Sequence, residues 1–156
     1  MVLRWTTLEN QTGHDGAWAL LSQMYAAETG LALPEVARTD RGKPYFLHSD
    51  YHFSLSHTKH HAFCCLSRRN VGIDAEELSR KVPLSLAQTI LSPTEKTRWE
   101  ASADKKDCLL RFWVLKEAYA KLTGRGLGGY LYETDFDPDD PRIQIIDGCY
   151  VAVMEE

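Results

Sequence analysis

The alternation of hydrophobic and polar residues changes period along this chain, and the changes mark out helices and strands. Apolar residues recur at helical spacing near the N-terminus, which predicts an amphipathic helix over residues 16–29 that ends at Gly30. Three β-rich runs follow, at residues 51–56, 62–67 and 71–76. Arg69-Asn70 predicts a tight turn between the last two runs, so we expect them to pair as a hairpin.

Helix signals dominate the middle of the chain. Pro83 precedes a helical stretch over residues 84–91. The segment 92–95 combines an N-cap serine, a first-turn proline and a capping-box glutamate, and it therefore predicts the start of another helix. A longer helix is predicted between Asp104, whose side chain can cap free amides, and Gly124, which stops it.

The order of elements predicts a mixed α+β fold. Apolar runs at 143–146 and 149–153 flank Asp147-Gly148, which is the strongest hairpin signal of the chain. Helix and strands in the first half are thus followed by helices and strands in the second. We expect one domain over residues 1–156, with two related halves of about 1–68 and 69–156 facing one another.

Two carboxylates lie close together on the predicted strand at 71–76. The two-residue period of a strand directs Asp74 and Glu76 to one face and Val71, Ile73 and Ala75 to the other. Two carboxylates on one face favour a cation.

The long helix carries a third candidate ligand. One apolar stripe consists of Cys108, Phe112, Leu115, Tyr119 and Leu122. Trp113, Glu117 and Lys121 share a different stripe at successive turns. If the helix packs its Glu117 side across the strand, Asp74, Glu76 and Glu117 supply three hard oxygen ligands, which suit Mg²⁺ better than zinc or copper. Such a site points to phosphate chemistry.

Composition narrows the function classes. The 156 residues have 44% hydrophobic content and a formal net charge of −4, which is typical of a globular protein and argues against a general nucleic-acid binder. Ten Lys or Arg residues nevertheless lie within 80–125, so a local basic face suits an acidic partner. No apolar run has the length of a membrane span, and the four cysteines show no Cys-x-x-Cys spacing. We expect a cytoplasmic protein.

These motifs resemble those of the phosphopantetheinyl transferases, whose hallmark is a Gly-Ile/Val-Asp segment followed by a Trp/Phe-x-x-Lys-Glu-Ala-x-x-x-Lys helix. Both occur here in order, as Gly72-Ile73-Asp74 and within residues 112–121. Three shorter segments also match: Gly42-Lys43-Pro44, Phe53-Ser54-Leu55-Ser56-His57 and Gly124-Arg125-Gly126-Leu127. The position of Asp74 is similar to that in the Sfp type, which is a pseudo-dimer of two similar halves in one chain with the active site between them.

The resemblance implies a holo-[acyl-carrier-protein] synthase activity. Such an enzyme transfers 4′-phosphopantetheine from coenzyme A to a serine of an apo acyl or peptidyl carrier protein and releases adenosine 3′,5′-bisphosphate. The resemblance implies Mg²⁺ held by Asp74, Glu76 and Glu117, and catalytic roles for Glu117, Lys121 and His57. Glu117 or a water on the metal then takes the serine proton. The implied coenzyme A contacts are Arg41, Lys43, Pro44, Ser56, His57, Lys116 and Lys121.

Each assignment has a simpler structural alternative. Asp74 and Glu76 alone are typical of solvated acids, and Glu117 has Lys121 at the spacing of a surface salt bridge. The four histidines within 52–61 also allow a metal-binding tract. Residues 17–30 contain no Lys or Arg, whereas Sfp-type members usually carry bases there for the 3′-phosphate of coenzyme A.

Two other functions stay open at this point. The absence of Lys and Arg from residues 17–30 favours a second hypothesis, a degenerate module that binds coenzyme A or a carrier protein without transferring phosphopantetheine. A metal-dependent nuclease also uses acids beside a lysine, but the net charge of −4 disfavours it. We expect a monomer without membrane or nucleic-acid partners, and the sequence leaves the type of carrier protein open.

Overall fold

The computed structural model describes residues 1–126 and 134–156 of the chain. In the first half it contains β1 (Val2–Thr7), α1 (Gly13–Thr29), β2 (Val36–Arg38), β3 (Pro44–Phe46), β4 (His52–His57) and β5 (His61–Ser67). The second half contains β6 (Val71–Glu77), a 3₁₀ turn η1 (Leu84–Leu86), α2 (Ala87–Ile90), α3 (Pro93–Ala101), α4 (Lys105–Thr123), β7 (Ile143–Ile146) and β8 (Cys149–Glu155). No described helix is long and apolar enough to cross a membrane.

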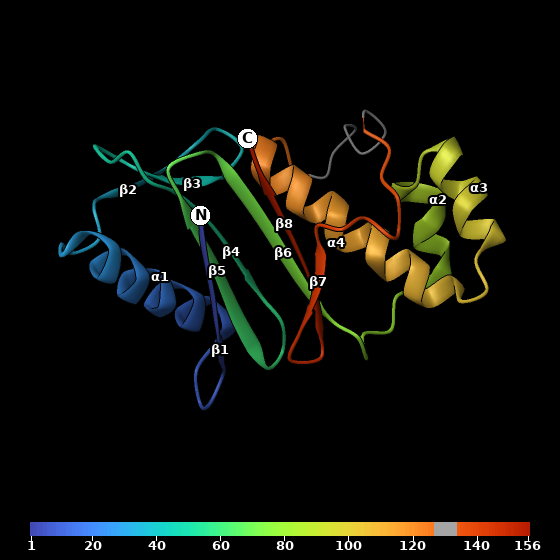
Figure 1. Cartoon of the computed structure of the whole chain (residues 1–156), viewed down its shortest axis with the longest axis horizontal. Helices are drawn as coiled ribbons and strands as arrows, with labels where there is room; N and C mark the ends of the chain where they lie inside the picture. The colour runs from blue at the N-terminus through green and yellow to red at the C-terminus, as the bar shows by residue number, and fades with distance from the viewer. Residues whose placement is uncertain (127–133) are drawn as a thin grey trace.

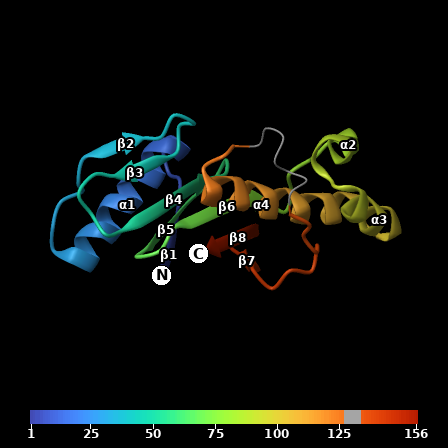
Figure 2. The same ribbon diagram turned by 90° about the horizontal axis from the view of Figure 1, so that it is seen from above.

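The two halves share one topology. Each has a three-stranded antiparallel sheet whose central strand comes last in the chain, with the order β1-β5-β4 in the first half and β6-β8-β7 in the second. One long helix follows the first strand of each sheet, with shorter helices before it in the second half. Figures 1 and 2 show α1 and α4 on opposite outer sides, with the strands between them. The mixed α+β class is therefore confirmed, and the described halves repeat one β-α-β-β plan.

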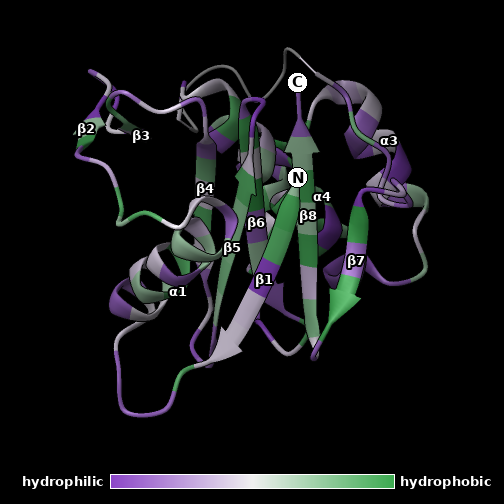
Figure 3. Ribbon diagram, turned by 60° about the vertical axis from the view of Figure 1, so that its left-hand side comes forward, coloured by the Kyte–Doolittle hydropathy of each residue, from purple (hydrophilic) through white to green (hydrophobic). Residues whose placement is uncertain are grey.

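Three apolar clusters hold these layers together. One lies between α1 and its sheet, and another between α4 and its sheet. The third lies between the two sheets, where Phe63 of β5 packs with Ile73 of β6 and Val151 of β8. In Figure 3 the central strands β5 and β8 carry mostly the hydrophobic colour, because both of their faces are buried.

The predicted hairpin between residues 62–67 and 71–76 is wrong. β5 pairs with β1 and β4, whereas β6 pairs with β8. The two strands do follow each other directly, but their apolar faces meet across the inter-sheet core and their edges do not pair. Alternation of apolar residues identifies a buried face, and it does not say whether the neighbour lies beside the strand or above it.

The predicted helix ends are confirmed where a side chain or a glycine sets them. Ser92 and Glu95 form the capping box of α3, and Asp104 accepts hydrogen bonds from two amides at the start of α4. Gly30 and Gly124 adopt the left-handed conformation that ends α1 and α4. The hairpin of β7 and β8 also forms around Asp147-Gly148. β1, β2 and β3 fall outside the elements predicted from the pattern.

Candidate active site

α4 packs against β6, and side chains of the helix meet the strand at two successive positions of one strand face. Lys121 Nζ lies 2.7 Å from Asp74 Oδ1, and Trp113 Nε1 donates to Glu76 Oε1 at 3.0 Å. The expected common face of Asp74 and Glu76 is confirmed, because both point toward α4.

Gly72 permits this close approach. A Cβ atom at Gly72 would lie 2.1 Å from the carbonyl oxygen of Ala118 and 2.4 Å from the amide nitrogen of Leu122. Both are backbone atoms of α4, so no side chain can move aside to make room. A glycine within a strand often marks such a contact, and this signal was present in the sequence.

Asp74 is held by both halves of the molecule. Ser56 on β4 donates to Asp74 Oδ1 at 2.9 Å and accepts from the amide of Ala75 at 3.1 Å. Asp74 is only 5% exposed, and its Oδ2 has no hydrogen-bond partner among the described residues. The buried hydroxyl of Ser56 is thus committed to orienting Asp74, which differs from its predicted contact with coenzyme A.

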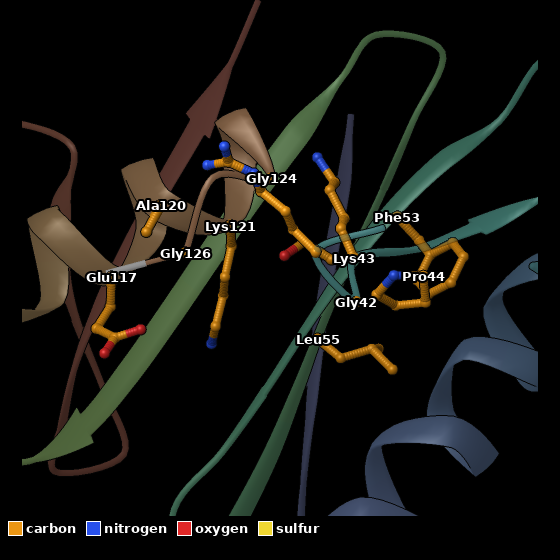
Figure 4. A pocket seen from close by; sticks show the side chains of 12 residues that line it. Gly42, Lys43, Pro44, Phe53, Leu55, Glu117, Ala120, Lys121, Gly124 and Gly126 are labelled. Atoms are coloured by element: carbon orange, nitrogen blue, oxygen red, sulfur yellow. The ribbon is translucent and has the colours of Figure 1, made fainter. Parts of the chain in front are cut away.

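Glu117 lies on the same stripe of α4 as Lys121, and both side chains point into a pocket (Figure 4). Burial raises the pKa of Glu117 to about 7, and the nearby Asp74 adds to this rise. Lys121 and Arg80 oppose it. Burial and the neighbouring carboxylate thus both disfavour the charged form of Glu117.

The donor set fits a divalent cation. Asp74 offers an unpartnered buried oxygen, and its charge adds to the burial that raises the pKa of Glu117, so the two carboxylates lie close enough to interact. Glu76 is the third predicted ligand, and it is engaged by Trp113 and Arg80. Over residues 1–126 and 134–156, no three side chains of metal-ligating type converge in binding geometry. A cation on Asp74 and Glu117 therefore requires Glu76 to turn if it is to be the third ligand.

The pocket opens where the two halves meet and has a volume of about 250 Å³. Its lining is shared between the β2–β3 turn, β4, and the last turns of α4 with the residues after it. It includes Arg41, Lys43 and Pro44 from the first half and Glu117 and Lys121 from the second (Figure 4). Phe53 and Leu55 give it an apolar part, which suits the non-charged part of a nucleotide or pantetheine ligand.

Lys43 ties the halves together. Its ammonium donates to the carbonyl of Leu122 and to Asn70 Oδ1, each at 2.7 Å. Burial lowers the pKa of Lys43, although Glu156 opposes this shift. The ammonium thus neutralises the carbonyl end of α4, and the stem of Lys43 faces the pocket. Arg41, on the same turn, donates to the carbonyl of Arg125 at 3.2 Å.

Lys116 does not lie where the sequence motif predicted. Its side chain is 1% exposed, and its ammonium lies 2.8 Å from Glu95 Oε2 at the start of α3. Lys116 and Lys121 are about 140° apart around the helix, while Glu117 and Lys121 are about 40° apart. Lys116 therefore faces away from the pocket, and we remove it from the candidate phosphate contacts.

His57 ends β4 and borders a second hollow beside the carboxylates. This hollow is also lined by Lys59, His60, Glu76 and Arg80. His57 lies against the start of α1, because a Cβ at Gly13 would come within 2.4 Å of its Nδ1. His57 thus lies toward Glu76, outside the lining of the first pocket. Leu127, the last residue of the matching glycine-rich segment, is outside the described residues.

Arg80 was not singled out by the sequence motifs. It contacts Glu76 Oε1 and lies over the ring of Trp113, with 5.6 Å from Cζ to the ring centroid. The sequence did offer one signal for a contact between the two side chains, because Arg80 follows Glu76 by four residues in a segment that predicts a connection.

Comparisons with known proteins identify one family. The family model described as "4'-phosphopantetheinyl transferase superfamily" matches residues 70–148, which is half of the chain. HetI of Nostoc, a 4′-phosphopantetheinyl transferase, is 38% identical over 56% of this chain and 40% of its own length. Sfp of Bacillus subtilis, also a 4′-phosphopantetheinyl transferase, is 30% identical over 50% of this chain and 35% of its own.

A third relative is the 4′-phosphopantetheinyl transferase gsp of Aneurinibacillus migulanus, at 29% identity over 58% of this chain and 38% of its own length. In these alignments the chain spans about two fifths of the length of the curated relatives. The matched segment 70–148 contains β6, α4, Asp74, Glu76, Glu117 and Lys121.

Proposed function

Because this chain belongs to the 4′-phosphopantetheinyl transferase superfamily, we propose that it transfers 4′-phosphopantetheine from coenzyme A to a serine hydroxyl of an apo carrier protein. One observation carries the proposal. Glu117 and Lys121 line a pocket between the halves, Asp74 is paired with Lys121 and interacts with Glu117, and a single chain supplies all three.

In the proposed reaction, the serine oxygen attacks the phosphorus that carries pantetheine. The bond from that phosphorus to the bridging oxygen breaks, and adenosine 3′,5′-bisphosphate leaves with the bridging oxygen. The serine proton passes to Glu117, whose carboxylate points into the pocket beside Lys121. Lys121 neutralises charge on the pyrophosphate, and His57 approaches the same phosphates from the second hollow.

We assign the cation site to Asp74 and Glu117, with Glu76 as third ligand. Mg²⁺ bound there would offset the charge of the pyrophosphate as its bond breaks. In the proposed pose, Arg41, the stem of Lys43 and Pro44 contact the nucleotide end. Ser56 acts indirectly by holding Asp74, and Lys116 has no part in ligand binding.

The experiment is intact-mass analysis of a panel of apo carrier proteins incubated with this protein, coenzyme A and Mg²⁺. We expect one carrier to gain one phosphopantetheine group, and the gain to disappear when EDTA replaces Mg²⁺. Glu117→Gln is expected to lower the rate at least about 100-fold, which is the usual contribution of a positioned base. Lys106→Gln, which removes an exposed charge at the far end of α4, serves as the control.

Two outcomes would redirect the assignment. If coenzyme A binds but no carrier gains mass, the chain is a binding module without transfer activity. If Glu117→Gln retains the full rate, Glu117 is not the base. The type of carrier protein stays open. It also stays a prediction that the protein acts as a monomer and is located in the cytoplasm.

A further inference from the structure

Glu76 is held in place by one neutral and one positively charged neighbour. The indole of Trp113 donates to Oε1 at 3.0 Å, and the Arg80 guanidinium contacts the same oxygen. Arg80 also lies over the Trp113 ring, at 5.6 Å from Cζ to the centroid. The three side chains thus form one cluster at the edge of the proposed cation site.

The two partners of this ion pair are unequally buried. The side chain of Glu76 is 13% exposed, whereas that of Arg80 is 44% exposed and borders the open hollow beside His57. Arg80 follows β6 in a connection that precedes η1, while Glu76 lies within the strand. The guanidinium can therefore leave toward solvent, but the carboxylate cannot.

The charge of Arg80 lies directly against a proposed metal ligand, because its guanidinium contacts Glu76 Oε1. An ion pair with one half-exposed partner is weak in water, because solvent screens it. A divalent cation brings twice the charge of a guanidinium to the same carboxylates. The guanidinium and the cation cannot occupy the space next to Oε1 of Glu76 at the same time.

We propose that Arg80 is a built-in counter-ion of Glu76, which competes with the divalent cation and is displaced into the neighbouring hollow when that cation binds. This inference rests on the proposed cation site at Asp74, Glu76 and Glu117. Arg80 thereby keeps Glu76 out of ligating geometry before the cation binds, and it lowers the affinity of the site for metal alone.

Two other roles for Arg80 predict different results. If Arg80 only forms a surface ion pair, its removal leaves metal affinity unchanged. If Arg80 orients Glu76 for the metal, its removal weakens metal binding. Of these three roles, competition is the one that predicts a rise in the affinity for metal when the guanidinium is removed, and the charge control below separates it from a general charge effect.

The test measures binding of Mn²⁺ alone, from the electron paramagnetic resonance signal of the free ion during titration. We expect Arg80→Gln to lower the Mn²⁺ dissociation constant by about threefold to tenfold, as expected for loss of a weak competing ion pair. Arg80→Lys keeps the charge and is expected to stay within about twofold of the unchanged protein.

Arg98→Gln is the matched control. Arg98 lies on α3, which is apart from β6 in Figure 1, and its side chain is 43% exposed. It contacts Asp137 at 3.6 Å and donates to the carbonyl of Phe136 at 2.6 Å. Its removal changes the net charge by the same amount at the same exposure, so we expect no change in Mn²⁺ affinity. An equal rise in affinity in both variants would show a general charge effect and overturn the proposal.

The remaining outcomes separate the proposal from the cation site itself. An unchanged or weaker affinity in Arg80→Gln, or no measurable binding in any variant, overturns the competition. If Glu76→Gln and Glu117→Gln weaken Mn²⁺ binding while Arg80→Gln does not tighten it, the cation site stands and the role of Arg80 is wrong. If these carboxylate variants bind Mn²⁺ normally, both the site and the competition are wrong.

Discussion

Two glutamates on neighbouring helices, Glu95 and Glu117, show how contacts decide the use of a buried carboxylate. Glu95 is fully buried and receives the amides of Ser92 and Phe136 as well as the ammonium of Lys116. It therefore serves to fasten α3 and the segment at Phe136 to α4. Glu117 is only partly buried, and desolvation together with the neighbouring Asp74 raises its pKa to about 7.

The first prediction concerns the ion pair of Lys116 and Glu95. Lys116→Ala is expected to lower the free energy of unfolding by about 3 to 5 kcal/mol, because it leaves the Glu95 charge buried without its cation. Urea denaturation at pH 7 measures the change. Lys106→Ala, at an exposed position of α4, is the control and is expected to stay within about 0.5 kcal/mol. A loss as small as the control's for Lys116→Ala would mean that the pair is not buried.

The second prediction concerns pH. The pKa of Glu117 is raised to about 7, so the folded state binds more protons than the unfolded state between about pH 4.5 and 7. Stability therefore falls as pH rises through this window, by less than about 1.4 kcal/mol per pH unit. Glu117→Gln should remove that fall. The variant is thus expected to be more stable than the unchanged protein at pH 8, with a smaller difference at pH 5, as measured by urea denaturation. The same difference at both pH values would contradict the raised pKa.

At the scale of elements, the contact of α4 with β6 sets the site. Gly72 brings the helix backbone against the strand, and the next two steps along β6 then meet Lys121 and Trp113. Small displacements of α4 thus change every distance among the charged groups. Lys43 adds a second constraint at the C-terminal end of the helix.

The third prediction tests this contact with Gly72→Ala. A Cβ atom there overlaps two backbone atoms of α4, so we expect a loss of stability of about 1 to 3 kcal/mol and a drop in transfer rate. Gly16→Ala is the matched control, since its Cβ meets the movable end of the Leu8 side chain. Urea denaturation and the intact-mass assay measure both effects. Wild-type stability and rate in Gly72→Ala would show that α4 does not depend on this contact.

At the scale of the whole molecule, the inter-sheet core joins two halves that are each small. Phe63 is fully buried in that core and contributes from the first half, while Ile73 and Val151 contribute from the second. Two histidine–carboxylate contacts add polar links, from His60 to Glu77 and from His61 to Asp147. Because neither half covers this apolar surface alone, we expect the halves to fold as one unit.

The fourth prediction follows from this shared core. Native-state hydrogen exchange in low urea is expected to show the slowest amides of β5 and β8 exchanging together, with equal opening free energies. Phe63→Ala should lower both by about 3 to 5 kcal/mol. A protein population in which only one of these strands has exchanged would show that the halves open independently.

Several features of this protein were predictable from the sequence by itself. The capping residues Ser92, Asp104 and Gly124 define helix ends through contacts within one or two turns. The strand period alone places Asp74 and Glu76 on one face. These features depend on local backbone geometry, which a short sequence segment contains in full.

Only the tertiary structure decided which segments meet. It replaced the expected hairpin of residues 62–67 and 71–76 with two facing sheets, turned Lys116 to Glu95, and committed Ser56 to Asp74. It also placed Arg80 against Glu76. Apolar faces and charged side chains have many compatible partners along a chain, and the choice among them depends on how all the layers pack at once.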